Sequence, residues 1–197
     1  MAMTWRCACG QMQGEIDPGR AYVRGTCHCR DCQAFARFLG RPGLMDANGG
    51  SDIVPMAPSG FRILRGDAQL ACMSLGPKGL LRWYASCCRT PLANTGRTPS
   101  PPYVGVPVLI LDAPGDKVDA AFGPRDATMI HAASATHPVK PTPLRFLIGG
   151  LKIMAGVLRE KLAGRARSTS FFDPLGQPVR SPEVLTLAER ERFSRPG

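Results

Sequence analysis

The chain has 197 residues, including 22 glycines, 19 prolines and eight cysteines, and its formal net charge is +10. This content of glycine and proline argues against a helical bundle and predicts many turns and short elements. No run of 18 apolar residues occurs, so we expect no transmembrane segment. The N-terminus lacks the apolar run of a signal peptide, and we therefore expect a cytoplasmic protein with reduced thiols.

The basic excess suits an acidic partner, such as nucleic acid, an anionic membrane surface or a small acidic metabolite. It is spread over both halves of the chain instead of forming one stripe. Aromatic stacking platforms interleaved with basic residues are not evident in the sequence. We therefore expect no nucleic-acid partner.

In chain order, alternating segments within residues 11–28 predict strands around a turn at Pro18 and Gly19. Residues 30–39 predict a short helix, and residues 40–51 a loop. Short strands are then expected at 53–56, 61–64, 69–74 and 80–84, followed by a loop at 94–103. The run 104–112 has the strongest buried-strand signal because of its β-branched residues. The spacing of these strands predicts a mainly β fold.

The C-terminal third differs in character. We expect residues 113–145 to be an irregular connecting segment, residues 145–163 to form an amphipathic helix, and a short helix to begin at about Leu187. This divides the chain into a zinc-binding β domain (1–112), the connecting segment (113–145), and a C-terminal helix and tail (146–197). The long helix is basic on one side. We expect its apolar face to pack on its own domain or on a second copy in a homo-oligomer, with a membrane surface as the alternative.

Seven of the eight cysteines fall into three groups: Cys7 and Cys9; Cys27, Cys29 and Cys32; and Cys87 and Cys88. Close groups separated by long segments are typical of zinc coordination. In a Cys-x-Cys pair on an extended chain, both side chains lie on the same face and can reach one ion. Disulfides are the rival interpretation, and the missing signal peptide argues against them. Cys72 stands alone in an apolar strand and is expected to be a core thiol.

Three stretches carry a family resemblance: "CACG" (7–10), "CHCRDCQ" (27–33) and "CCRTPL" (87–92). Over roughly residues 4–110 the chain resembles the glutathione-dependent formaldehyde-activating enzyme and centromere protein V family. The resemblance implies a β-tent fold of small antiparallel sheets with two zinc sites, and for this chain we expect one or two Zn²⁺ ions. It assigns Cys27, Cys29 and Cys32 to an open site, and Cys7, Cys9 and Cys88 to a closed structural site.

The last motif departs from the family pattern, which is F-C-x-x-C-G. Ala85 stands where the first cysteine is expected, and Arg89 stands where the glycine is expected. Cys87 is a candidate for the missing ligand. Adjacent cysteines share an ion only in a turn, because on a strand they face opposite ways.

The open site suggests a chemistry. Three thiolates on Zn²⁺ leave one position free, and a thiol that binds there loses its proton and becomes nucleophilic. By the resemblance, we expect carbon–sulfur bond chemistry of a lyase-like enzyme on a small acidic thiol such as glutathione, which adds to an aldehyde or is released from the adduct. Arg30 is the candidate for holding its carboxylate. The alternative is a non-catalytic zinc-stabilised binding module with a basic surface.

Overall fold

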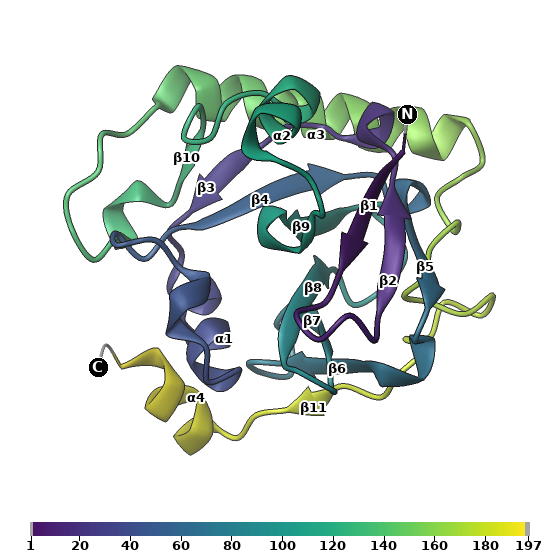
Figure 1. Cartoon of the computed structure of the whole chain (residues 1–197), viewed down its shortest axis with the longest axis horizontal. Helices are drawn as coiled ribbons and strands as arrows, with labels where there is room; N and C mark the ends of the chain where they lie inside the picture. The colour runs from purple at the N-terminus through teal and green to yellow at the C-terminus, as the bar shows by residue number, and fades with distance from the viewer. Residues whose placement is uncertain (1, 196–197) are drawn as a thin grey trace.

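Two sheets form the framework of the protein (Figure 1). The computed structural model describes residues 2–195. A three-stranded sheet has the order β1–β2–β5, and an eight-stranded sheet has the order β10–β3–β4–β9–β8–β7–β6–β11. The short strands β10 and β11 pair in parallel with β3 and β6, and the other pairs are antiparallel. The strands are β1 (Met3–Arg6), β2 (Gln13–Ile16), β3 (Gly25–Cys27), β4 (Ser51–Met56), β5 (Phe61–Arg65), β6 (Leu70–Ser74), β7 (Leu81–Ala85), β8 (Thr90–Thr95), β9 (Val104–Pro107), β10 (Met129–Ile130) and β11 (Glu183–Val184).

Four α-helices surround this framework: α1 (Arg30–Phe38), α2 (Gly115–Phe122), α3 (Pro143–Leu162) and α4 (Leu187–Ser194). Helix α3 runs along the edge of the molecule beyond β3 and β4, while α1 and α4 lie together at the opposite corner (Figure 1). The rings of Phe38 and Phe193 join α1 to α4, with centroids 5.6 Å apart. The expected mainly β fold with a C-terminal helix is confirmed, as are the predicted helices that begin near residues 30, 145 and 187.

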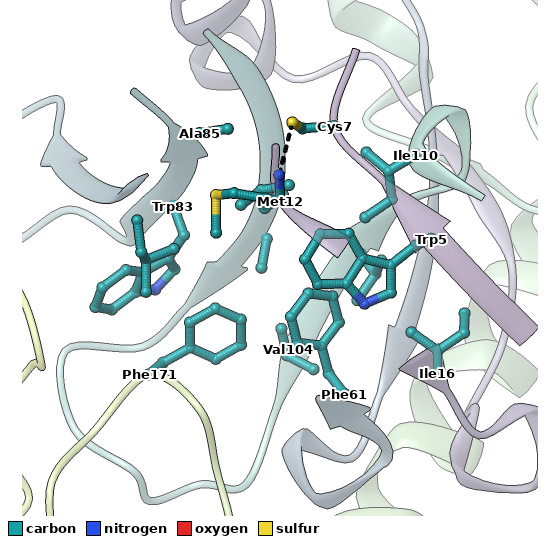
Figure 2. Packing of buried hydrophobic residues seen from close by; sticks show 14 of the residues in the cluster. Trp5, Cys7, Met12, Ile16, Phe61, Trp83, Ala85, Val104, Ile110 and Phe171 are labelled. Atoms are coloured by element: carbon teal, nitrogen blue, oxygen red, sulfur yellow. Dashed lines mark hydrogen bonds between the residues drawn. The ribbon is translucent and has the colours of Figure 1, made fainter. Parts of the chain in front are cut away.

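The main hydrophobic core is aromatic and lies between the two sheets (Figure 2). Trp5 of β1 stacks on Phe61 of β5, with ring centroids 5.0 Å apart. Phe171, from the segment that follows α3, lies 5.2 Å from Phe61 and 5.1 Å from Trp83 of β7. The C-terminal part of the chain therefore shares the core of the N-terminal part, although the expected domain boundaries themselves stay a prediction.

Two segments differ from the expectation. The predicted strand 104–112 ends as β9 at Pro107, and a 3₁₀ turn follows that buries Ile110 in the core. Within the supposedly irregular residues 113–145, the chain forms α2 and β10. Helix α2 follows Pro114, ends at Gly123 with a φ of +86° and buries Val118. This placement of proline and glycine is the usual signal of helix ends. β10 has two residues and forms by pairing with β3, which only the tertiary fold supplies.

Helix α3 does not bury the face that carries most of its large apolar side chains, which is the face that the sequence predicts to be buried. Its buried residues are Gly149, Gly156, Val157 and Glu160, whereas most of its large apolar side chains are exposed. The glycines allow close approach: a Cβ at Gly156 would lie 2.3 Å from the ring of Tyr22. Glu160 accepts hydrogen bonds from Arg20 and Ser59 at 2.9 and 2.8 Å. Most of the apolar face therefore does not pack on the chain's own domain, and its packing on a second copy stays a prediction.

Candidate metal centres

Four thiols from two distant parts of the chain meet at one end of the small sheet. The sulfur atoms of Cys7, Cys9, Cys87 and Cys88 all lie within 4.8 Å of one another. The Sγ–Sγ distance is 3.6 Å for Cys7 and Cys9, 3.4 Å for Cys9 and Cys87, and 3.8 Å for Cys87 and Cys88. In a tetrahedral zinc site with Zn–S bonds of about 2.3 Å, the sulfurs lie about 3.8 Å apart. The spacing and the chemistry of these donors thus fit a closed Zn²⁺ site.

The turn between β7 and β8 explains how adjacent cysteines join one cluster. Cys87 and Cys88 lie in the turn 86–89, so they escape the opposite orientation that a strand imposes. Ala85, at the family's cysteine position, is the last residue of β7 and is buried. Arg89, at the family's glycine position, has a φ of +54°, in the left-handed region that favours glycine. Its guanidinium donates to the carbonyl oxygen of Leu39 at 3.0 Å and lies over the Phe38 ring.

Groups outside the cluster form hydrogen bonds with two of its sulfurs, although burial still raises the pKa of Cys7 and of Cys87. The backbone N–H of Met12 donates to Cys7 Sγ at 3.3 Å (Figure 2). Cys88 Sγ lies 3.1 Å from Thr90 Oγ1. Burial opposes ionisation of Cys88, but hydrogen bonds with Thr90, Cys9 and Cys7 outweigh it and lower the pKa of its thiol to about 6. A thiol of this kind is deprotonated at neutral pH, which is the state that a metal binds.

Three further thiols meet at the start of α1. Cys27 ends β3, Cys29 caps the helix, and Cys32 lies in its first turn, where its backbone N–H donates to Cys29 Sγ at 3.3 Å. The three sulfurs lie within 4.8 Å of one another, and those of Cys27 and Cys32 are 4.0 Å apart. No fourth cysteine, histidine, aspartate or glutamate among residues 2–195 joins this group. The predicted convergence of the three thiols is confirmed, and their number and chemistry fit a metal site with one open position; that the ion is Zn²⁺ stays a prediction.

Two positive features face this three-thiol cluster. The first is the N-terminus of α1, whose free N–H groups favour negative charge. The second is Arg82 of β7, which is only 2% exposed and whose Nη1 lies 3.8 Å from Cys32 Sγ. Hydrogen bonds with Cys27 and Cys29, together with the charge of Arg82, hold the pKa of Cys32 well below its usual range despite burial. A cluster of three thiolates with one Zn²⁺ carries a net charge of −1, which the buried guanidinium offsets.

Arg82 has few other partners. It donates to Asn94 Oδ1 at 3.2 Å, and its Cζ lies 5.3 Å from the centroid of the Phe35 ring. Asp31 is its nearest carboxylate, at 3.9 Å, and that side chain is half exposed. The sequence did not point to Arg82, because this residue lies 50 positions from Cys32 and belongs to β7, whereas Cys32 belongs to α1. On β7 it alternates with the buried Leu81 and Trp83, a pattern that predicts a solvent-facing arginine, so the local sequence gives no signal of its burial.

A small cavity opens against the three-thiol cluster. Cys32 and Arg82 line it together with Asn94 and apolar side chains that include Phe35 and Met45. The cavity wall beside Cys32 is therefore mostly apolar, and its polar side chains are Arg82, Asn94 and Ser51. The volume of this cavity is about 20 Å³, which is room for about one water molecule.

The arginines that lie near this cluster in sequence have different surroundings. Arg30, the predicted carboxylate-binding residue, is the first residue of α1 and is exposed. Its side chain forms no hydrogen bond or ion pair with the residues that the structure describes. Arg24 binds Asp52 and Asp119 at 2.7 and 2.6 Å, and Arg20 binds Glu160. Arg41 instead donates to the carbonyl oxygen of Cys88 at 3.1 Å, beside the four-thiol cluster. Of this group, only Arg30 remains available for a ligand of the open site.

His28 and Cys72, which stand apart from the two groups of metal-binding candidates, are both buried. His28 is 1% exposed, and its Nδ1 has no hydrogen-bond partner among residues 2–195. Cys72 is 4% exposed in the aromatic core, and burial raises the pKa of its thiol to about 12.

The eight cysteines are all free thiols. No helix among the described residues combines the length and apolar character needed to cross a membrane.

Comparison with known proteins gives two findings. The model of a family of unknown function, DUF6151, matches residues 2–183, which include both cysteine clusters and α3. The chain is also similar to a Rhodobacter sphaeroides protein of known crystal structure, at 22% identity and a TM-score of 0.43, over 62% of this chain and 99% of that chain. A search of curated proteins found no match.

Proposed function

This chain belongs to the DUF6151 family, and we propose that it is a zinc-dependent protein of carbon–sulfur bond chemistry that acts on a small thiol. The observation that carries the proposal is the three-thiol cluster of Cys27, Cys29 and Cys32 beside the buried Arg82. A closed structural site takes four protein ligands, whereas a reactive site keeps one position for another molecule. The four-thiol cluster supplies the closed site within the same chain.

The roles of the residues follow from their surroundings. Bound at Cys27, Cys29 and Cys32, Zn²⁺ would supply one coordination position at which the sulfur of a small thiol is held deprotonated. Arg82 and the N-terminus of α1 offset the added negative charge. Phe35 and Met45 provide apolar walls of the small cavity beside Cys32. Arg30 is exposed at the start of α1, next to Cys29 in the sequence. In this proposal it holds a carboxylate of an acidic thiol such as glutathione.

The resemblance of the three cysteine motifs to the formaldehyde-activating enzyme family supports an aldehyde as the second reactant. In this reaction the thiolate sulfur forms a bond to the carbonyl carbon, and the carbonyl oxygen takes a proton, so that a hydroxyalkyl thioether results. Cleavage of the adduct is the reverse reaction. The balance needs no oxidant and no further cofactor.

The test replaces zinc by Co²⁺, whose thiolate charge-transfer absorption reports the ligands of each site. Titration with glutathione is expected to change the absorption of the wild-type protein and of Cys9→Ser, which keeps the open site. The change is expected to disappear in Cys29→Ser. Adduct formation from glutathione and formaldehyde, followed by NMR, is expected to be faster with the wild-type protein than with Cys29→Ser.

The alternative, a non-catalytic zinc-stabilised module, predicts a different result. In that case the Cys27, Cys29 and Cys32 ion has a fourth ligand from the protein, and glutathione leaves the Co²⁺ spectrum unchanged in all three proteins. Such a result would refute the thiol-binding site. A spectral change without acceleration of adduct formation would retain thiol binding and reject this aldehyde.

A further inference from the structure

Helix α3 presents a continuous apolar stripe to solvent. Six large apolar side chains, spaced three or four residues apart, are between 56% and 81% exposed: Leu144, Leu147, Leu151, Met154, Leu158 and Leu162. This spacing places them on one face of the helix. A helix of 20 residues is about 30 Å long, so the stripe is long and narrow.

The outward orientation of the stripe is determined by the opposite face. Gly149, Gly156 and Glu160 are buried against the body of the protein. Glu160 is 0% exposed and is held by Arg20 at 2.9 Å and by Arg165 at 3.0 Å. Rotation of α3 to bury its leucines would break this buried ion pair and bring side chains against Tyr22, where only a glycine fits. The stripe is thus a permanent surface feature.

The exposed charges of α3 are all basic. Arg145, Lys152 and Arg159 are exposed and lie seven residues apart, which puts them in one row beside the stripe. Lys161 adds a fourth exposed charge. Glu160 is the only acidic residue of the helix, and it is buried. A groove between α2, α3 and the segment that precedes β3, lined in part by Arg145 and Lys152, opens beside the row.

This pattern distinguishes between the possible occupants of the stripe. Paired helices of two copies usually carry complementary charges beside the apolar seam, but α3 has no exposed acid to meet the basic row of a second copy. An anionic bilayer offers acyl chains to the stripe and negative headgroups to the row at the same time. We propose that α3 lies in the surface of a membrane that contains anionic lipid, with its axis parallel to that surface.

The experiment is co-sedimentation of the full chain with two kinds of vesicle, phosphatidylcholine alone and phosphatidylcholine mixed with phosphatidylserine. Wild-type protein is expected to bind the mixed vesicles, and salt is expected to weaken the binding. The stripe variant, Leu147→Gln with Leu151→Gln, is expected to lose it. The row variant, Arg145→Gln with Lys152→Gln and Arg159→Gln, is expected to bind on the order of a hundredfold more weakly.

Two controls match these changes elsewhere on the surface. Leu64→Gln removes an apolar side chain that is as exposed as Leu151, at 61%. Arg65→Gln with Lys78→Gln and Arg192→Gln removes three exposed charges from other elements. Both controls are expected to bind like the wild type. Equal binding by the stripe variant, equal weakening by the three-charge control, or no binding to either vesicle would overturn the proposal. So would a dimer in light scattering that the stripe variant dissociates, since this would identify a second copy as the occupant.

Discussion

The Nη1 atom of Arg82 lies 3.8 Å from Sγ of Cys32, although the two residues come from β7 and α1. Arg82 is almost completely buried, and a buried cation is costly unless an anion accompanies it. The half-exposed Asp31 at 3.9 Å is a weak partner. The neighbouring sulfur therefore accounts best for the retention of this charge.

Replacement of Arg82 by methionine, which keeps an unbranched stem and removes the charged guanidinium, tests this relationship. We expect the zinc affinity of the three-thiol cluster to fall by about ten- to a hundredfold, because a charged hydrogen bond is worth about 1.5–3 kcal/mol. Competition titration with a chromophoric chelator measures the affinity. Arg30→Gln, which removes an exposed charge, serves as the control and is expected to bind zinc like the wild type. Equal affinities for wild type and Arg82→Met would mean that the guanidinium does not act on the metal site.

The four-thiol cluster gives a prediction for metal content and stability. Cys87→Ser is expected to reduce the zinc content of the protein from two ions to one. It is also expected to lower Tm by more than about 10 °C, since binding energy at a structural site is folding energy and 1 kcal/mol corresponds to about 2–4 °C in a chain of this size. Mass spectrometry of the metal and thermal unfolding measure the two effects.

Cys72→Ala is the matched control for the loss of a thiol. Cys72 shares the aromatic core with Cys7 but belongs to neither group of converging thiols, so Cys72→Ala is expected to leave two zinc ions in place. If Cys87→Ser also kept both ions, Cys87 would not be a ligand and the turn 86–89 would contribute Cys88 alone.

The surroundings of two glycines in α3 predict that substitution by alanine has opposite effects on stability at the two positions. A Cβ at Gly156 meets the Tyr22 ring at 2.3 Å, whereas a Cβ at Gly150 has nothing within 4 Å. We expect Gly156→Ala to destabilise the protein by about 1–3 kcal/mol through overpacking. Gly150→Ala is expected to stabilise it by up to about 1 kcal/mol, because alanine favours a helix. Urea unfolding of both variants gives the comparison, and a stable Gly156→Ala would show that α3 moves away from Tyr22 at little cost.

The buried carboxylate of Glu160 predicts a dependence of stability on pH. Burial opposes its ionisation, but Arg165, Ser59 and Arg20 outweigh burial and hold the pKa of Glu160 below its ordinary value. A lowered pKa in the folded state adds stability above the unfolded value of about 4.3, and this stability is lost as the pH falls through the folded pKa. We expect Glu160→Gln to be less stable than wild type at pH 7 by about 1–3 kcal/mol.

The difference between wild type and Glu160→Gln is expected to shrink as the pH falls below about 4, since protonation then removes the same charge from the wild type. Urea unfolding across this range measures it. Asp112→Asn breaks the exposed ion pair with Arg6 and is expected to cost less than about 1 kcal/mol at any pH. A constant difference for Glu160→Gln from pH 7 to pH 3 would contradict the role of its charge.

Much of the local structure follows from the sequence alone. The short strands, the helix at Arg30 and the long helix at Pro143 are encoded by periodicity and turn residues that act over a few positions. The spacing of Cys27, Cys29 and Cys32 likewise determined their cluster, because a strand end and one helical turn bring these sulfurs together. Local geometry is sufficient in each case.

Other features depended on contacts between distant residues. Cys87 joins Cys7 and Cys9 only because the turn 86–89 meets the start of the chain. Arg82 of β7 reaches Cys32 of α1, and β10 forms only against β3. For α3 the amphipathic pattern correctly predicted a helix but not which face it buries. That choice was made by close packing at two glycines and by the buried ion pairs of Glu160, which outweigh the burial of six leucine and methionine side chains and leave them on the surface.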